Sequence, residues 1–106
     1  MPTIPRYRRP TTPAELLVKD FLEPLTITPR AFARRLGLSC ARFDDILNER
    51  APVTADTALR LARVLGMSAE FWLNAQLVLD LYEAMHSAGA SDIAALEPIA
   101  ELRSAS

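Results

Sequence analysis

The sequence predicts an all-α domain built from five helices. Half of its 106 residues are apolar, which is enough for one core, and only three are glycine. Few glycines and few aromatic residues disfavour a sheet-rich sandwich or barrel. Residues that begin and end helices recur, with apolar residues at helical spacing between them. We therefore expect an extended N-terminal arm over residues 1–12, the helical domain over residues 13–88 and a short C-terminal tail over residues 89–106.

Five helix starts are marked by a threonine or serine whose side chain can accept a hydrogen bond from the first turn. These N-caps are Thr12, Thr28, Ser39, Thr54 and Ser68. Proline follows both threonines of the first two helices, at the first helical position, and Glu15 lies where a capping box with Thr12 requires it. The caps therefore divide the domain into five helices with short connections.

Proline and glycine mark the helix ends. Pro24 predicts that the first helix stops near residues 21–23, because proline lacks an N–H and its ring clashes with the preceding turn. Gly37 and Gly66 follow the second and fourth helices, where glycine adopts the left-handed backbone conformation. The fifth helix is expected to run to about Ser87. Beyond it, residues 91–97 form a candidate short helix.

Helices two and three have the spacing of a helix-turn-helix. Ala33 is small, so the two helices can cross closely, and Gly37 accepts the backbone conformation of a tight turn. Leu38, Phe43 and Ile46 then hold the third helix against the second. The pattern resembles the helix-turn-helix of the phage repressor and Cro class, placed second and third in an all-helical domain. Two ordinary packed helices joined by a tight corner are the alternative.

The third helix, which begins after Ser39, has a polar face opposite its buried one. At about 100° per residue, Ala41, Asp45 and Asn48 lie opposite Phe43. In a major groove we expect Asp45 to accept a hydrogen bond from cytosine N4, Asn48 to pair with adenine and Ala41 to contact a thymine methyl group. Asp44 is expected to point away from the bases. Asp45 would raise selectivity while lowering affinity, because it lies among phosphates.

The attraction for phosphates must then come from basic residues elsewhere. Residues 1–50 carry a net charge of +3, from nine Arg and Lys against six Asp and Glu, whereas residues 51–106 carry −4, from three against seven. Arg30 and Arg50 are expected to contact phosphates, and Arg42 a phosphate or a guanine. The other arginines of this half are also candidates for phosphate contact, and the alternative is that they are solvated on the surface. They are Arg6, Arg8, Arg9, Arg34 and Arg35. The predicted DNA-binding residues are Arg30, Ser39, Cys40, Ala41, Arg42, Asp45, Asn48 and Arg50.

The fifth helix carries more apolar surface than one face of a small domain can cover. Its apolar residues form three stripes, of which one can pack within the domain. The others predict an interface with a second copy of the chain or with a different protein. The residues assigned to this interface are Trp72, Leu73, Leu77, Leu79, Leu81 and Met85. Alternatively, the tail folds back over this surface with Ile93, Leu96, Ile99 and Leu102, and both arrangements are compatible with each other.

No pattern of catalytic or cofactor-binding residues is visible. His86 is the only histidine and has no companions at metal-ligand spacing, and Cys40 is the only cysteine, which is compatible with a reducing compartment. No apolar run approaches the roughly 20 residues of a membrane span, and no signal peptide opens the chain. We therefore expect a cytoplasmic protein that is not an enzyme and has no cofactor, no metal and no contact with a membrane.

Five segments between Arg9 and about Tyr82 carry a family resemblance: RPTTPAELLVKDFLEPL, FARRLGLS, ILNER, TADTALRLARVLG and SAEFWLNAQLVLDLYEA. They resemble the HigA-type antitoxins, XRE-like helix-turn-helix partners of HigB-type ribonuclease toxins. The resemblance implies a homodimer that binds operator DNA, represses its own toxin–antitoxin operon and neutralises a HigB-like mRNA-cleaving toxin by direct binding. It also implies DNA contacts through the positions of Ser39, Arg42, Asp45 and Asn48.

The sequence departs from the family pattern at the recognition helix. Where family members often carry Ser, Thr or Arg, this chain has Cys40, Ala41 and Asp44, so its operator is expected to differ. Two other functions remain compatible with the sequence. One is a stand-alone XRE-family transcriptional repressor without a toxin partner. The other, motivated by Asp44 and Asp45, is a protein-interaction module that does not bind DNA.

Overall fold

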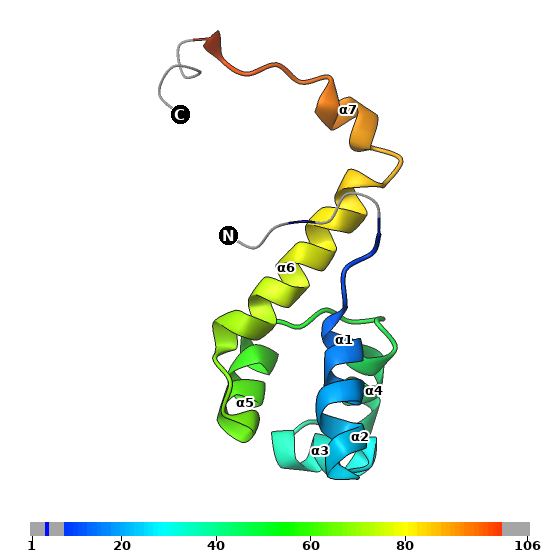
Figure 1. The fold of residues 1–106 in the computed structure, drawn as a ribbon, viewed down its shortest axis with the longest axis vertical. Helices are drawn as coiled ribbons and strands as arrows, with labels where there is room; N and C mark the ends of the chain where they lie inside the picture. The colour runs from blue at the N-terminus through cyan, green and yellow to red at the C-terminus, as the bar shows by residue number, and fades with distance from the viewer. Residues whose placement is uncertain (1–3, 5–7, 101–106) are drawn as a thin grey trace.

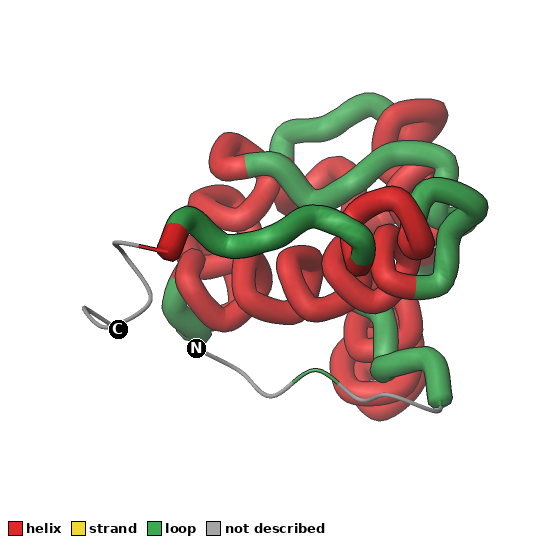
Figure 2. The backbone as a smooth tube through the Cα atoms, turned by 90° about the horizontal axis from the view of Figure 1, so that it is seen from above, coloured by secondary structure: helices red, strands yellow, loops and turns green. Residues whose placement is uncertain are grey.

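The computed structural model describes residue 4 and residues 8–100, and all regular structure among them is helical (Figures 1 and 2). The first helix consists of three consecutive segments, α1 (Pro13–Leu16), the π-helical segment η1 (Leu17–Leu22) and α2 (Glu23–Leu25). The others are α3 (Pro29–Leu36), α4 (Cys40–Leu47), α5 (Ala55–Leu65), α6 (Ala69–Met85) and α7 (Ala90–Ala94). The predicted all-α fold is thus confirmed. Within the described residues, each helix is too short or too polar to cross a membrane.

The predicted helix caps all form. The side-chain oxygen of each predicted N-cap accepts a hydrogen bond from the N–H three residues further on. The N–H of Thr12 donates to Glu15 Oε1 at 3.3 Å, which completes the capping box. Gly37 and Gly66 follow α3 and α5 in the left-handed conformation, with φ of 71° and 79°. Local sequence signals therefore fix where most helices begin and end.

Pro24 does not stop the first helix where predicted. The helix continues to Leu25, and Thr26 ends it in the left-handed conformation with φ of 55°. In η1 the hydrogen bonds reach five residues back, as from the N–H of Glu23 to the carbonyl of Val18. This wider turn makes room for a ring that would otherwise clash with the carbonyl four residues before it. The helix can therefore pass through the proline.

The core lies where the first helix, α3, α4, α5 and the first half of α6 meet. Phe32 of α3 and Phe43 of α4 are each 1% exposed, and their ring centroids lie 5.5 Å apart. Trp72 of α6 is fully buried and contacts the rings of Phe21 and Phe71, at centroid distances of 5.8 Å and 5.1 Å. The aromatic pair between α3 and α4 fixes the crossing of the helix-turn-helix.

Two residues assigned to an intermolecular interface are instead buried within the chain. Trp72 is fully covered and Leu79 is 5% exposed, because α6 turns this face toward the first helix and α5. The assignment of these two residues is therefore wrong. On the outer side of α6, Leu73 is 36% and Met85 47% exposed. Leu77 and Leu81 are half-buried there.

The tail does not fold back over α6 in the part that the structure describes. The second half of α6 extends beyond the domain, and the chain after it leads away (Figure 1). Ile93, Leu96 and Ile99 are 60%, 74% and 63% exposed, whereas Leu102 lies outside the described residues. The radius of gyration is 17.0 Å, against about 13 Å for a compact chain of this length. The predicted helix at 91–97 is shorter, spanning Ala90–Ala94.

Candidate nucleic-acid interface

The turn between α3 and α4 is held in place by a side chain from α5. The Nη1 atom of Arg60 donates to the carbonyls of Leu36, at 2.9 Å, and Gly37, at 3.4 Å. These carbonyls belong to the end of α3, where helical partners run out. A Cβ at position 37 would lie 2.9 Å from the same Nη1 atom, so a larger residue would displace the Arg60 guanidinium from the turn, and the positive φ itself favours glycine.

The first turns of α3 and α4 form one exposed surface. A groove between them is lined by Pro29, Arg30, Cys40, Ala41, Phe43 and Asp44. The exposed predicted DNA-binding residues around this groove are Arg30, Ser39, Cys40, Ala41 and Arg42. The structure therefore brings Arg30 of α3 together with Cys40 and Ala41 of α4 at this groove, which Asp45, Asn48 and Arg50 do not line. Free backbone N–H groups at two adjacent helix starts also favour a phosphate there.

One arginine pairs with both aspartates of α4. Arg50 Nε donates to Asp45 Oδ1 at 3.0 Å, and Arg50 Nη2 donates to Asp44 Oδ2 at 2.8 Å. These hydrogen bonds, that of Asp45 first, raise the pKa of Arg50 above its ordinary value. The helical wheel separates the aspartates, but the structure joins both to one guanidinium. Their side chains are 60% exposed for Asp44 and 48% for Asp45.

The side-chain amide of Asn48 is hydrogen-bonded to the last turn of α4. Its Nδ2 donates to the carbonyl of Asp44 at 2.8 Å and to Asp44 Oδ1 at 3.1 Å. An adenine would have to compete with these bonds, so the predicted adenine contact requires Asn48 to turn outward.

A second carboxylate lies near the guanidinium of Arg42. Asp56, in the first turn of α5, accepts from Arg60 Nε at 2.8 Å and lies 3.7 Å from Arg42 Nη2. The hydrogen bond with Arg60 lowers the pKa of Asp56. Arg42 thus faces a carboxylate that already has a closer partner, which leaves its guanidinium available to an incoming phosphate or guanine.

Sequence reasoning missed three residues of this interface: Glu49, Asp56 and Arg60. The spacing of Asp56 and Arg60 is that of an i,i+4 helical pair and could have indicated their contact. No sequence signal indicates that Arg60 reaches the turn, because that contact depends on how α5 crosses α3. Glu49 binds Arg9 of the arm, which was a candidate for phosphate contact.

Comparisons with known proteins identify relatives of this chain. No protein-family model matches the chain. The chain is 42% identical over 69 residues to virulence-associated protein I of Dichelobacter nodosus, an alignment covering 65% of this chain and 64% of that protein. It is 40% identical over 76 residues to antitoxin HigA-1 of Vibrio cholerae, covering 72% of this chain and 71% of that protein.

A solved structure of the Pseudomonas aeruginosa antitoxin HigA with the higBA promoter has the same fold. It matches with a TM-score of 0.79 at 37% identity, covering 86% of this chain and 99% of that one. The similarity therefore extends over the first helix, the helix-turn-helix and most of α6 rather than over the helix-turn-helix alone. From the fold, the interface and these two lines of similarity, we conclude that the chain belongs to the HigA-type antitoxin family of XRE-like helix-turn-helix proteins.

Proposed function

We propose that the chain is the antitoxin of a type II toxin–antitoxin module. In this proposal it forms a dimer, binds operator DNA, represses its own operon and neutralises a HigB-like mRNA-cleaving toxin by direct binding. The proposal depends above all on the exposed surface at the starts of α3 and α4, in a chain whose HigA relative has been solved with its promoter. An exposed recognition helix held rigidly by its neighbours is what base reading requires.

DNA binding is expected to place the first turn of α4 in the major groove. Ala41 and Arg42 would then contact base edges, because recognition helices of this class read bases with their N-terminal residues. Arg30, exposed at the start of α3, would contact a phosphate at the groove rim. Asp45 would offer the carboxylate oxygen that Arg50 does not hold to a cytosine amino group.

The outer face of α6 supports the proposed dimer. Leu73, Leu77, Leu81 and Met85 follow one another at intervals of four residues, so they form a single stripe about 18 Å long. Two copies joined along such a stripe would present two recognition helices to DNA. Successive major grooves on one side of the duplex lie about 34 Å apart, which predicts a palindromic operator.

The two aspartates of α4 argue less strongly against DNA binding than the sequence implied. Asp44 and Asp45 share a counter-ion, so α4 does not present two uncompensated negative charges to the phosphates. The toxin-binding surface is not assigned to any residue. A stand-alone repressor and an antitoxin both bind DNA, and they differ only in whether the protein has a toxin partner.

Two measurements test the proposal. The purified protein should shift duplex DNA from its own promoter, with affinity falling steeply as salt rises. Co-expression with the product of the adjacent reading frame should restore growth that this product alone arrests. Absence of a shift at low salt would refute the DNA-binding function. A shift without any rescue of growth would favour the stand-alone repressor.

A further inference from the structure

We propose that the N-terminal arm acts on DNA binding through the recognition helix rather than by touching DNA. In this proposal Arg9 and Glu49 are positioning residues, whose ion pair fixes the backbone that carries Arg50 and the end of α4. The inference rests on the proposed DNA-binding function and adds a residue pair to it. It assigns to the arm a role in protein structure, where the sequence suggested phosphate contact.

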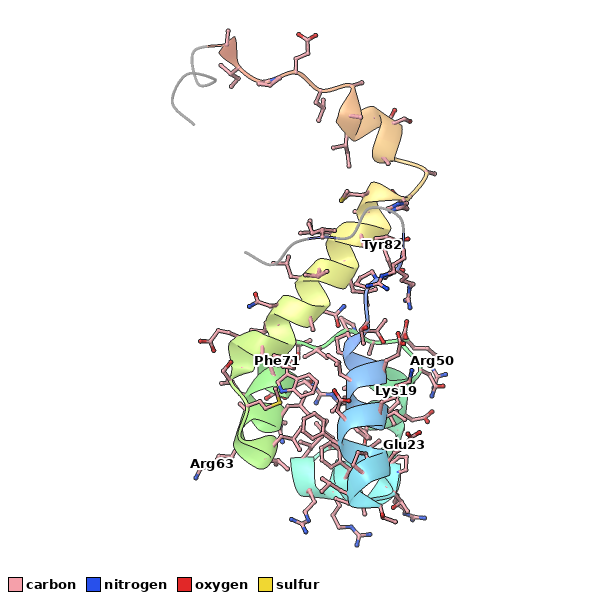
Figure 3. The ribbon with its side chains drawn as sticks, viewed as in Figure 1. Lys19, Glu23, Arg50, Arg63, Phe71 and Tyr82 are labelled. Carbon is pink, nitrogen blue, oxygen red and sulfur yellow. The ribbon has the colours of Figure 1, made fainter. Side chains whose placement is uncertain are left out.

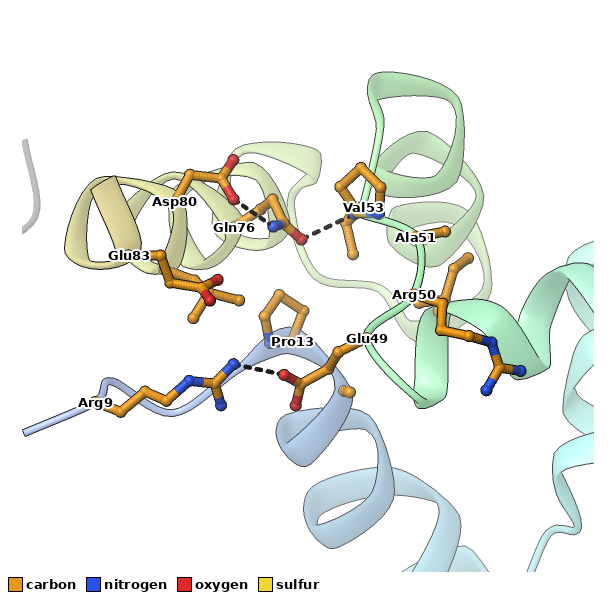
Figure 4. A pocket seen from close by; sticks show the side chains of 13 residues that line it. Arg9, Pro13, Glu49, Arg50, Ala51, Val53, Gln76, Asp80 and Glu83 are labelled. Atoms are coloured by element: carbon orange, nitrogen blue, oxygen red, sulfur yellow. Dashed lines mark hydrogen bonds and ion pairs between the residues drawn. The ribbon is translucent and has the colours of Figure 1, made fainter. Parts of the chain in front are cut away.

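The arm is attached to the segment after α4 at two points. Arg9 Nη2 donates to Glu49 Oε1 at 2.6 Å (Figure 4). Thr12 Oγ1 donates to Glu49 Oε2 at 3.1 Å. Thr12 is fully buried, and as the N-cap of α1 it is fixed to the domain. Both carboxylate oxygens of Glu49 are therefore bound by residues that precede α1.

Glu49 has a backbone conformation that non-glycine residues rarely adopt. Its φ is 60°, in the left-handed region, where a Cβ is unfavourable. Such a conformation persists when surrounding contacts hold it. Here the contacts are the backbone hydrogen bond from the Glu49 N–H to the carbonyl of Ile46, at 3.1 Å, and those of the carboxylate with Arg9 and Thr12. Without them, the segment is expected to relax toward other conformations.

The conformation of Glu49 decides where Arg50 points. Glu49 directly precedes Arg50, and the N–H groups of Arg50 and Ala51 both donate to the carbonyl of Asp45, at 2.8 Å and 3.1 Å. These bonds bring the Arg50 guanidinium to Asp44 and Asp45. Releasing Glu49 would therefore loosen the counter-ion of both aspartates on the recognition helix.

Arg9 is held in an acidic hollow rather than on the DNA-binding surface. The hollow is lined by Arg9, Glu49, Gln76, Asp80 and Glu83, among other residues (Figure 4). Gln76 is engaged there, with Nε2 donating to Asp80 and Oε1 accepting from the N–H of Val53. Glu49 contacts the guanidinium of Arg9 directly, and Asp80, Glu83 and Arg50 line the same hollow.

The effect of single substitutions on operator binding distinguishes this proposal from simple electrostatics. Electrostatics alone predicts that Arg9→Ala weakens binding and Glu49→Gln, which removes a negative charge, strengthens it. The proposal predicts that both weaken it, by about three- to fivefold, the range of a partly exposed ion pair. The double variant should be no weaker than either single variant, because both remove one interaction.

Arg8→Ala is the matched control. Arg8 is exposed and makes no ion pair among the described residues, yet its removal changes the charge of the arm by the same amount. Fluorescence anisotropy with the operator duplex should show Arg8→Ala within about twofold of the wild type. Equal weakening by Arg8→Ala and Arg9→Ala, or tighter binding by Glu49→Gln, would overturn the proposal.

Hydrogen exchange in the DNA-free protein separates this proposal from the proposed function. The amides of Arg50 and Ala51 should exchange faster in Arg9→Ala and Glu49→Gln than in the wild type and Arg8→Ala. Unchanged exchange would overturn the positioning role. If the wild type binds no duplex at all, the proposed DNA-binding function fails, while the exchange rates still decide the positioning role.

Discussion

Substitution of Arg50 tests how Asp44 and Asp45 of the recognition helix affect the affinity for DNA. If Arg50 stays paired with Asp44 and Asp45 on DNA, neutralising the aspartates removes the same two negative charges with or without Arg50. If Arg50 instead moves to a phosphate on binding, neutralising the aspartates also releases Arg50, so the gain in affinity is larger when Arg50 is present. We therefore compare the effect of neutralising both aspartates, by Asp44→Asn with Asp45→Asn, in the wild type and in the Arg50→Ala variant.

The expected magnitude follows from the exposure of the groups and their distance from DNA. Both aspartates and Arg50 are largely exposed, so water screens them and their interactions are modest. At roughly 10 Å from a phosphate, an uncompensated carboxylate in water costs about a factor of two in affinity. Neutralising two of them should therefore improve operator binding about fourfold in the Arg50→Ala variant. If Arg50 stays with the aspartates, the same removal of two charges should also give about fourfold in the wild type, and a larger gain is expected only if Arg50 moves to a phosphate.

Fluorescence anisotropy with the operator duplex at roughly 10 mM salt is the appropriate assay, because the Debye length is then about 30 Å. Arg30→Ala is the control, since Arg30 is exposed and makes no ion pair among the described residues. Its effect should be the same with or without the aspartates. A clearly larger gain from neutralising the aspartates in the presence of Arg50 than in its absence would refute the counter-ion role and favour phosphate contact.

Three further predictions concern stability and assembly. The hydrogen bond from Arg9 holds the pKa of Glu49 below its ordinary value, so the pair stabilises the fold at pH values above the ordinary pKa of glutamate. Its contribution is lost as the pH falls toward the lowered pKa. Chemical denaturation should therefore show that the stability difference between the wild type and Glu49→Gln shrinks between pH 7 and pH 3.5. Trp72→Ala should lower the free energy of unfolding by about 3–5 kcal/mol, whereas Trp72→Phe should cost less, because the buried indole N–H has no acceptor among the described residues; similar costs would contradict this. Leu77→Glu should make the protein monomeric by sedimentation, while Leu59→Glu, at a residue that is 64% exposed on α5, should leave the dimer intact.

The helix starts could be predicted from the sequence because capping is local. A side-chain oxygen and an N–H three residues later meet in any helix, so Thr12, Thr28, Ser39, Thr54 and Ser68 indicate their caps without knowledge of the fold. The end of the first helix could not be predicted in this way. Whether Pro24 stops a helix depends on whether the preceding turns widen, as they do in η1.

The sides of α6 could not be assigned from the sequence either. A helix that is apolar all round has no preferred buried face, so periodicity does not distinguish Trp72 and Leu79 from Leu73 and Leu77. Only the packing of the first helix and α5 shows that Trp72 points inward. The surface formed by α3 and α4 was predicted correctly because their apolar residues occupy one side.

The ion pairs of the interface lie beyond sequence reasoning for another reason. In the sequence Arg60 and Arg9 were indistinguishable from solvated arginines, and Arg50 was expected to contact a phosphate. Each instead reaches a specific acceptor within the protein, across a turn or between elements. Arg50 and Arg63 lie on opposite sides of the domain, although both appear in the sequence as surface cations (Figure 3). The direction of a long side chain is set by the backbone around it, which the sequence pattern does not supply.

The arrangement of charge explains how a slightly acidic chain could bind DNA selectively. Arg50 pairs with both Asp44 and Asp45, Arg42 lies beside Asp56, and Arg9 pairs with Glu49. The recognition helix and the segment after it therefore carry nearly equal numbers of positive and negative charges. Non-specific attraction must then come from the exposed arginines of α3, which are Arg30, Arg34 and Arg35. A neutral reading surface beside a basic one contributes little to binding at random sequences, because phosphate attraction is the sequence-independent part of affinity. Specific contacts by Ala41, Arg42 and Asp45 would then form a larger share of the total at the operator, which favours discrimination over strength.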